Sequence, residues 1–290
     1  MIRKDRSTIR MALPKGRMQD GVISLLADAG IEVRAAKRGY RPGLSLPNFE
    51  AKILKPQNLI EMLGAGSRDV GFAGADWVAE LGFELTELLD TGLDPVRMVA
   101  AAPADLLEGG SLPKARLVIA SEYERLAGEW IRREGLDASL VRTYGATEVF
   151  PPEDADLIVD LVASGETLRA NKLVEVAELM RSSTRLYANP SAMKEPSKRA
   201  EIEELVMLLK SVLEARSRVM VELNVPADRL ESVIEILPCM REPTMAQLHG
   251  GAGYAVKAAV PRADLPRLIP EIKRRGGTDI VVMSLAQIMS

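Results

Sequence analysis

The chain is poor in the residues on which many enzymes depend. Its 290 residues include one histidine (His249), one cysteine (Cys239) and few aromatic side chains, namely 2 Trp, 5 Tyr and 4 Phe. A Ser-His-Asp or Cys-His centre would have to use His249, and a structural zinc site of Cys and His has too few ligands. A single cysteine also excludes an intrachain disulfide, which suits a reducing compartment. Chemistry in this protein is expected to use carboxylates, basic side chains, hydroxyl groups and backbone amides.

Excess positive charge and long apolar segments are absent as well. The 38 Lys and Arg residues are balanced by 41 Asp and Glu, which leaves a net charge of −3. Nucleic-acid binding is not expected from this balance, since few rings remain to stack on bases. No apolar run approaches the ~20 residues of a membrane span, and residues 1–10 lack the apolar core of a signal peptide. We expect a soluble, cytoplasmic protein that contacts no membrane.

Short apolar strands alternate with amphipathic helices through the first two thirds of the chain. The pattern predicts strands at residues 9–13, 51–54, 70–73, 98–102, 117–120, 140–144 and 157–162. It predicts helices at residues 19–29, 56–65, 122–134 and 167–180, with a further helix starting at Trp77. This alternation is typical of an α/β fold with a largely parallel sheet.

A long amphipathic helix is predicted for residues 200–216, and a domain boundary near its end. The rest of the chain predicts a strand at 219–225, a helix at 227–237, two strands of which the second is 254–260, a helix at 263–275 and a strand at 279–284. This βαββαβ order indicates a ferredoxin-like domain.

A turn rich in hydroxyl groups follows the strand at residues 157–162. Asp160 lies near the end of that strand, and the turn consists of Ala163, Ser164, Gly165, Glu166, Thr167 and Leu168. Backbone N–H groups and the two hydroxyls could converge there on a phosphate. An ordinary capped helix start explains the same residues, and the spacing excludes a Walker A loop.

Two acidic residues lie at or just after the carboxyl ends of predicted strands. Asp160 precedes the turn, and Glu148 follows Gly145–Thr147. Carboxylates at the carboxyl ends of strands could bind sugar hydroxyls or a hydrated Mg²⁺. Taken singly, each could equally be a solvated loop acid.

Two further segments combine glycine with charge. Lys15, Gly16 and Arg17 place two cations beside an approachable backbone, which suits a polyphosphate or a pyrophosphate leaving group, although a basic surface turn would look the same. Gly71, Gly74 and Asp76 mark a strand edge where a ligand could approach, and tight helix packing explains these glycines equally well.

These segments together resemble the ATP phosphoribosyltransferase family. Residues 160–168, with Asn171 and Leu173, resemble its phosphoribosyl pyrophosphate loop, and residues 13–18 resemble its opening motif. Residues 69–76 and 145–148 resemble its central glycine-rich segment and the stretch before its loop. Residues 241–244 and 276–279 resemble the regulatory domain of its long form. The resemblance runs from about residue 9 to residue 289.

The resemblance implies an architecture. It predicts a two-lobed catalytic core of the periplasmic-binding-protein-like, type IV phosphoribosyltransferase kind, followed by a ferredoxin-like regulatory domain. One lobe would comprise residues 1–97 with 183–214, the other residues 98–182, and the regulatory domain residues 215–290. It also implies a homo-hexamer built from dimers.

The resemblance implies a reaction as well. N1 of the ATP adenine would displace pyrophosphate from 5-phosphoribosyl 1-pyrophosphate, in the first step of histidine biosynthesis, with Mg²⁺ bridging the pyrophosphate. The turn at 163–168 would bind the 5-phosphate, Asp160 and Glu148 the ribose hydroxyls, and Lys15 and Arg17 would act at pyrophosphate or ATP. The contacts to ATP or pyrophosphate would also include Gly16, Lys55, Gly71, Gly74 and Asp76.

Histidine is the implied inhibitor, with Asn224, Thr244, Gly277 and Thr278 as its candidate contacts. The chain departs from the usual family residues at Lys55, Asn58 and Glu153, where Arg, Asp and a nearby Gly are common. Two competing interpretations are a solute-binding protein and a non-catalytic amino-acid sensor. The first predicts a secretion signal, and the second predicts loss of Lys15, Arg17 or Asp160, all of which are present.

Overall fold

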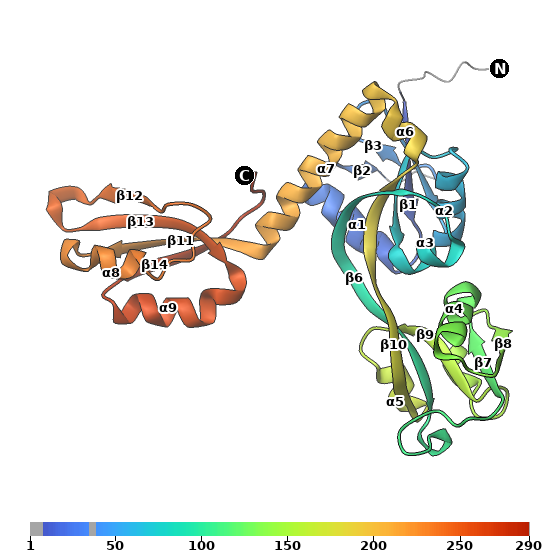
Figure 1. Ribbon diagram of the computed structural model, residues 1–290. Helices are drawn as coiled ribbons and strands as arrows, with labels where there is room; N and C mark the ends of the chain where they lie inside the picture. Colours follow the sequence, from blue (N-terminus) through green and yellow to red (C-terminus); the bar gives the residue numbers. More distant parts are fainter. Residues whose placement is uncertain (1–7, 35–38, 290) are drawn as a thin grey trace. The chain divides into compact units, whose positions relative to one another are not determined.

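The computed structural model describes residues 8–34 and 39–289 (Figure 1). Contacts divide the chain into two compact units. The first holds the chain up to Ser24 together with Ile31–Glu203, and the second holds Leu25–Gly30 with Glu204–Ser290. Each unit contains its own sheet and its own core, so each is described separately below.

The first unit is built on an eight-stranded sheet with the order β4-β1-β5-β10-β6-β9-β7-β8. The strands are β1 (Ile9–Pro14), β4 (Phe49–Leu54), β5 (Val70–Gly74), β6 (Thr86–Pro103), β7 (Leu117–Ser121), β8 (Ala138–Arg142), β9 (Leu157–Val162) and β10 (Leu173–Ala188). The helices are α1 (Met18–Asp28), α2 (Pro56–Gly64), α3 (Ala75–Leu81), α4 (Glu124–Glu134), α5 (Glu166–Ala170), α6 (Pro190–Lys194) and the start of α7 (Pro196–Ser217). Strands β2 (Val33–Arg34) and β3 (Gly43–Leu44) form a separate small pair.

Two long antiparallel strands, β6 and β10, connect two groups of shorter strands (Figure 1). On one side β10 pairs with β5, which continues into the parallel group β1 and β4. On the other side β6 pairs with β9, which continues into the parallel group β7 and β8. Separate apolar cores support the two groups, one around Leu59 and Leu63 and the other around Ile119 and Trp130. The predicted α/β fold with two lobes is confirmed.

The prediction of a largely parallel sheet is wrong at its centre. Strand β10 runs antiparallel to β5 and β6, and β6 runs antiparallel to β9. The helix predicted at residues 167–180 is also wrong beyond α5, because the chain enters β10 at Leu173. Leu173, Val176, Ala177 and Met180 do have helical spacing, but β6 offers backbone partners along the whole of β10, and this pairing prevails over local periodicity.

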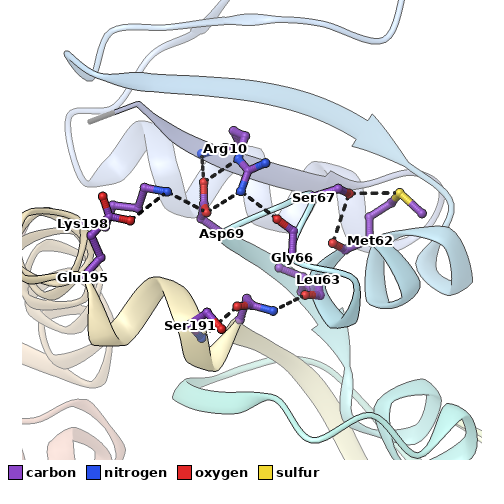
Figure 2. A network of polar contacts seen from close by, with 10 residues as sticks. Arg10, Met62, Leu63, Gly66, Ser67, Asp69, Ser191, Glu195 and Lys198 are labelled. Atoms are coloured by element: carbon purple, nitrogen blue, oxygen red, sulfur yellow. Dashed lines mark hydrogen bonds and ion pairs between the residues drawn. The ribbon is translucent and has the colours of Figure 1, made fainter. Parts of the chain in front are cut away.

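A buried ionic network joins β1 to α7 (Figure 2). The Arg10 guanidinium donates to both carboxylate oxygens of Asp69 at 2.8–2.9 Å and to the Gly66 carbonyl at 2.8 Å. Lys198 of α7 donates to the same Asp69 carboxylate at 3.2 Å. Burial alone would raise the pKa of Asp69, but these cations hold it below the ordinary value. The network lies at the amino ends of β1 and β5, opposite the ends where ligands of α/β sheets bind.

The second unit contains the predicted ferredoxin-like sheet. Its order is β12-β13-β11-β14, formed by β11 (Arg218–Val225), β12 (Thr244–Gln247), β13 (Tyr254–Pro261) and β14 (Thr278–Ser284). Helices α8 (Leu230–Ile234) and α9 (Leu265–Arg274) supply the rest of the βαββαβ order, α8 being shorter than the helix predicted at residues 227–237. Alternate residues of β11, among them Val221 and Leu223, pack into one core with Leu268 and Ile272 of α9. No helix in the described part of the chain is long and apolar enough to cross a membrane.

Candidate active site

A cavity of about 250 Å³ lies where β9 ends and the following turn begins. It is lined by Arg17, Glu148, Ile158, Asp160, Leu161, Val162, Ala163, Ser164, Gly165, Thr167 and Leu168. Eight of these were predicted as site residues from the sequence: Arg17, Glu148, Asp160, Ala163, Ser164, Gly165, Thr167 and Leu168. The structure therefore brings together segments that are more than 130 positions apart, with a guanidinium from the turn after β1 and two carboxylates at one small hollow.

The carboxyl group of Asp160 has a shifted pKa. Burial raises the pKa of Asp160 to about 6, and the neighbouring carboxylates of Glu148 and Glu122 add to the rise. Two donors act in the opposite direction, namely the Leu161 N–H, 2.7 Å from Oδ1, and the Thr147 hydroxyl. A carboxyl group with a raised pKa in a cleft is typical of a functional site. A cation or hydroxyl donors that arrive with a ligand would stabilise the ionised form of such a group.

The turn at residues 163–168 has a backbone suited to an anion. Gly165 adopts φ +74°, in the left-handed region, and α5 begins directly after it. The Glu166 N–H lies 3.4 Å from the Ser164 hydroxyl oxygen. The N–H groups of a first helical turn have no acceptors within their own helix, so those at 167 and 168 are available to a phosphate, and the Glu166 N–H can exchange its long contact with Ser164 for one. Since α5 has only five residues, these N–H groups matter more here than the dipole of the long helix predicted from the sequence.

The two cations of the basic turn at residues 15–17 have different surroundings. Arg17 lines the cavity, whereas the Lys15 ammonium lies 3.1 Å from the Tyr40 hydroxyl and 4.8 Å from the centre of its ring. The hydrogen bond from Lys15 lowers the pKa of Tyr40, and the charge of Lys55 adds to this effect. Lys15 and Lys55 follow paired positions of the parallel strands β1 and β4. With Tyr40 they form an exposed basic cluster.

The glycine-rich strand β5 has packing reasons for its composition. A Cβ on Gly71 would lie 3.0 Å from Ala12, and a Cβ on Gly74 would lie 2.4 Å from the carboxylate of Asp76. Asp76 itself is 4% exposed and hydrogen-bonded to Tyr123 and Ser182. Of the two explanations left open by the sequence, the structure supplies direct contacts for internal packing.

Three of the four candidate effector contacts lie together in the second unit. Asn224 of β11 and Thr278 of β14 are paired in the sheet, and both donate to the Asp279 carboxylate at 3.0 Å. The Asn224 hydrogen bond lowers the pKa of Asp279. Gly277, directly before Thr278, has no room for a side chain, since a Cβ there would lie 2.4 Å from Ile272. Thr244 lies apart on β12, with β13 between it and β11.

The sequence did not predict three residues that contact the candidate site residues, namely Thr147, Tyr40 and Asp279. Thr147 is 1% exposed, shares a 2.8 Å hydrogen bond with Thr143 and supports Asp160. Its place directly before Glu148 was the only available signal. Tyr40 and Asp279 gave none, because each acquires its role from residues distant in the chain.

Family models match most of the chain. The model described as ATP phosphoribosyltransferase matches residues 55–211, and the model of the HisG C-terminal domain matches residues 215–287. The ATP phosphoribosyltransferase of Pelotomaculum thermopropionicum is 33% identical over 288 residues, covering 97% of this chain and 99% of that protein. The enzyme of Chlorobaculum parvum is 34% identical over 283 residues, covering 94% and 95%.

A solved structure supports the fold. A chain of the ATP phosphoribosyl transferase (HisG:HisZ) complex from Thermotoga maritima aligns with a TM-score of 0.63 and 24% identity, covering 71% of this chain and 99% of that chain. The same family is indicated by the sequence matches over nearly the whole chain, by the two family models and by the C-terminal domain. This chain belongs to the ATP phosphoribosyltransferase family and has the architecture of its long form.

Proposed function

We propose that this enzyme joins N1 of the ATP adenine to C1 of 5-phosphoribosyl 1-pyrophosphate, releasing pyrophosphate and N1-(5-phosphoribosyl)-ATP. The supporting observation is the cavity in which Asp160, the turn at 163–168 and Arg17 meet. The backbone N–H groups of the turn suit a phosphate, and the two carboxylates suit the ribose hydroxyls. The Arg17 guanidinium suits the negative charge of a departing pyrophosphate. Membership of the family supplies the rest, since it places the enzyme at the first step of histidine biosynthesis.

The proposed mechanism needs no protein nucleophile. In it, the backbone N–H groups after Gly165 hold the 5-phosphate, and Asp160 and Glu148 accept hydrogen bonds from the ribose hydroxyls. Ionised Asp160 also stabilises positive charge that develops at C1 as the bond to pyrophosphate lengthens. Arg17 balances negative charge on the leaving group. The adenine nitrogen carries its own lone pair, so the main task of the protein is to align two polyanions.

Magnesium is proposed to arrive with the pyrophosphate of the substrate. The described residues contain no group of three His, Cys, Asp or Glu side chains able to hold a metal ion by themselves. The oxygen atoms of Asp160 and Glu148 at the cavity are the donor type that Mg²⁺ prefers, and the raised pKa of Asp160 fits a cation nearby. When bound, Mg²⁺ would supply charge neutralisation of the pyrophosphate.

The direct test is ultraviolet detection of phosphoribosyl-ATP from ATP, phosphoribosyl pyrophosphate and Mg²⁺. Product formation that requires all three components supports the proposal. Binding of either substrate without any product would favour the alternative, a non-catalytic amino-acid or solute-binding relative. Release of pyrophosphate without ATP would contradict the assignment of adenine as the nucleophile.

The rate is expected to depend on the ionisation of Asp160. Only the carboxylate form accepts hydrogen bonds from both ribose hydroxyls, so kcat/KM for phosphoribosyl pyrophosphate should rise with pH through about 6 and level off above it. In Thr147→Val the carboxylate loses a donor, so the rise should move to higher pH. Titration of the substrate phosphate would not shift between the two proteins. A pH profile that is flat from pH 5 to 8 would contradict the role of Asp160.

We further propose feedback inhibition by histidine at the Asn224–Thr278 cluster. The Asp279 carboxylate there suits an α-amino group, and the hydroxyl and amide groups suit a carboxylate. Asn224→Ala is expected to raise the histidine concentration for half-inhibition by about tenfold, the value of one charge-assisted hydrogen bond. Its kcat without histidine should remain unchanged. If Thr244→Ala shifts inhibition and Asn224→Ala does not, the site lies instead at the β12 edge.

Assembly into a homo-hexamer built from dimers is also proposed. The sheet of the second unit exposes large apolar side chains, including Met245 at 49% and Val281 at 48%. Exposed apolar side chains on one sheet favour contact with other subunits. Light scattering after gel filtration should give a mass six times that of the chain. The enzyme is proposed to work in the cytoplasm, where its phosphorylated substrates occur.

A further inference from the structure

A buried carboxylate links the two lobes of the first unit. The Tyr123 hydroxyl donates to Oδ2 of Asp76 at 3.0 Å, with Tyr123 2% and Asp76 4% exposed. Asp76 opens α3 beside β5, whereas Tyr123 lies between β7 and α4, on the other side of the β6–β10 pair. The Ser182 hydroxyl of β10 donates to Oδ1, and the Asp76 N–H donates back to that hydroxyl oxygen at 3.0 Å. The carboxylate is thus held from both lobes and from the strand between them.

The hydrogen bonds continue toward the cavity. The Tyr123 N–H donates to the Ser121 hydroxyl oxygen at 2.9 Å, and that hydroxyl donates to the Val159 carbonyl at 2.7 Å. Ser121 is fully buried, and Val159 directly precedes Asp160 on β9. Two sets of buried hydrogen bonds, one at the hydroxyl and one at the backbone N–H of Tyr123, therefore connect Ser182 to the residue next to the proposed ribose-binding carboxylate.

Neighbouring contacts reinforce the same interface. The rings of Trp77 and Tyr123 lie 4.7 Å apart, and the Glu80 carboxylate of α3 accepts hydrogen bonds from the N–H groups of Arg125 and Leu126 at 2.9 and 3.0 Å. These two N–H groups belong to the first turn of α4, where an anion is favoured. A side chain of one lobe thus caps a helix of the other. The alignment of the lobes is held by directional contacts as well as by apolar packing.

We propose that Tyr123 and Asp76 form a latch that positions Asp160 opposite the basic turn at residues 15–17, and that both are positioning residues for phosphoribosyl transfer. The inference rests on the proposed function, because it assumes that the two substrates contact different lobes. A displacement of about 1 Å between reacting groups can lower a rate by about 100-fold. A latch of buried hydrogen bonds suits this task, since each group has few alternative partners in its surroundings.

The test is Tyr123→Phe, which keeps the ring against Trp77 and removes only the donor to Asp76. Ser121 and the backbone of β9 are untouched, so KM and Kd for phosphoribosyl pyrophosphate should stay within about threefold while kcat falls by about 10- to 100-fold. The matched control is Tyr187→Phe. Tyr187 is also buried, at 4% exposure, and its hydroxyl lies 3.5 Å from Glu87 within the first lobe. Its kcat should stay within about twofold of the parent value.

A second variant and thermal unfolding distinguish loss of the latch from a folding defect. Asp76→Asn leaves one acceptor oxygen for the two hydroxyl donors of Tyr123 and Ser182, and it is expected to lower kcat as well. The loss in the double variant should be smaller than the product of the two single losses, because both variants weaken the same contact. Thermal unfolding of each protein checks that it is folded. Equal kcat values for Tyr123→Phe and Tyr187→Phe would overturn the latch, as would additive losses in the double variant or loss of substrate affinity parallel to kcat. An inactive parent enzyme with intact substrate binding would instead overturn the proposed function.

Discussion

Replacing Asp160 with asparagine is expected to abolish phosphoribosyl transfer and at the same time to stabilise the folded protein. Asparagine retains an oxygen that can accept the Leu161 N–H, so the local structure should persist. It carries no charge to stabilise the reacting ribose, and removal of one such preorganised group lowers kcat by about 100- to 1000-fold or more. Steady-state kinetics with both substrates at saturation measure this loss.

The stability gain follows from the pKa of Asp160. The folded protein holds this carboxyl at a pKa of about 6 against 3.8 for the free group, so between these values the folded state binds more protons than the unfolded state. The free energy of unfolding therefore declines as pH rises from about 4 to about 6, and the deficit persists above that range. Asparagine removes it, which should add about 1–3 kcal/mol at pH 7.5 and raise the Tm by a few degrees.

The exposed Asp154 provides the matched control for this variant. Asp154→Asn removes the same charge from a nearby loop and should leave both kcat and Tm unchanged. The Tm difference between Asp160→Asn and the parent should also vanish below about pH 4, where both states of the parent are protonated. An Asp160→Asn protein that is active, or that melts earlier than the parent at pH 7.5, would contradict the assignment.

Valine at position 165 is expected to abolish binding of phosphoribosyl pyrophosphate while leaving the protein folded. Gly165 adopts φ +74°, which a β-branched side chain avoids, and the new Cβ would lie 3.2 Å from the Arg169 guanidinium. The turn would have to change its backbone and redirect the N–H groups at residues 166–168. Loss of two or three such hydrogen bonds should weaken binding by at least about 100-fold, measurable by calorimetry.

Two further variants distinguish the effect of a changed backbone at residue 165 from the effect of replacing a glycine elsewhere. Gly165→Asn should retain part of the affinity, because asparagine tolerates the left-handed conformation better than valine does. Gly128→Ala in α4 should bind normally, since its Cβ would meet nothing within 4 Å and helices favour alanine. Normal binding by Gly165→Val would show that the phosphate is held elsewhere.

Much of the cavity could be predicted because its residues are consecutive. The turn at residues 163–168 and Asp160 come from one strand–turn–helix unit, and local signals describe such a unit well. Arg17 could be expected to lie near Asp160 because it follows a parallel strand, and ligands of α/β sheets gather where these strands end. The lining of the cavity by Glu148, Asp160 and Arg17 agrees with that reasoning.

The roles of Asp76 and Tyr123 could not be predicted in this way. Local sequence made Asp76 a ligand candidate because the glycines before it let a ligand approach the strand edge. Its actual partners, Tyr123 and Ser182, lie 47 and 106 positions away. Only the meeting of α3, β7 and β10 makes it a buried hydrogen-bond acceptor.

The sequence by itself determined which chemistry this protein can use and where its short elements lie. Scarcity of histidine, cysteine and aromatic residues left carboxylates, cations and backbone amides, and the apolar periodicity located most strands and helices. The tertiary structure alone decided the course of residues 173–188, which have helical spacing at their start but form β10. A strand is stabilised by its partner, and here the partner β6 begins more than 80 positions earlier in the chain. The same non-local pairing brings Arg17 to Asp160, so the candidate active site exists only after the two long strands have met.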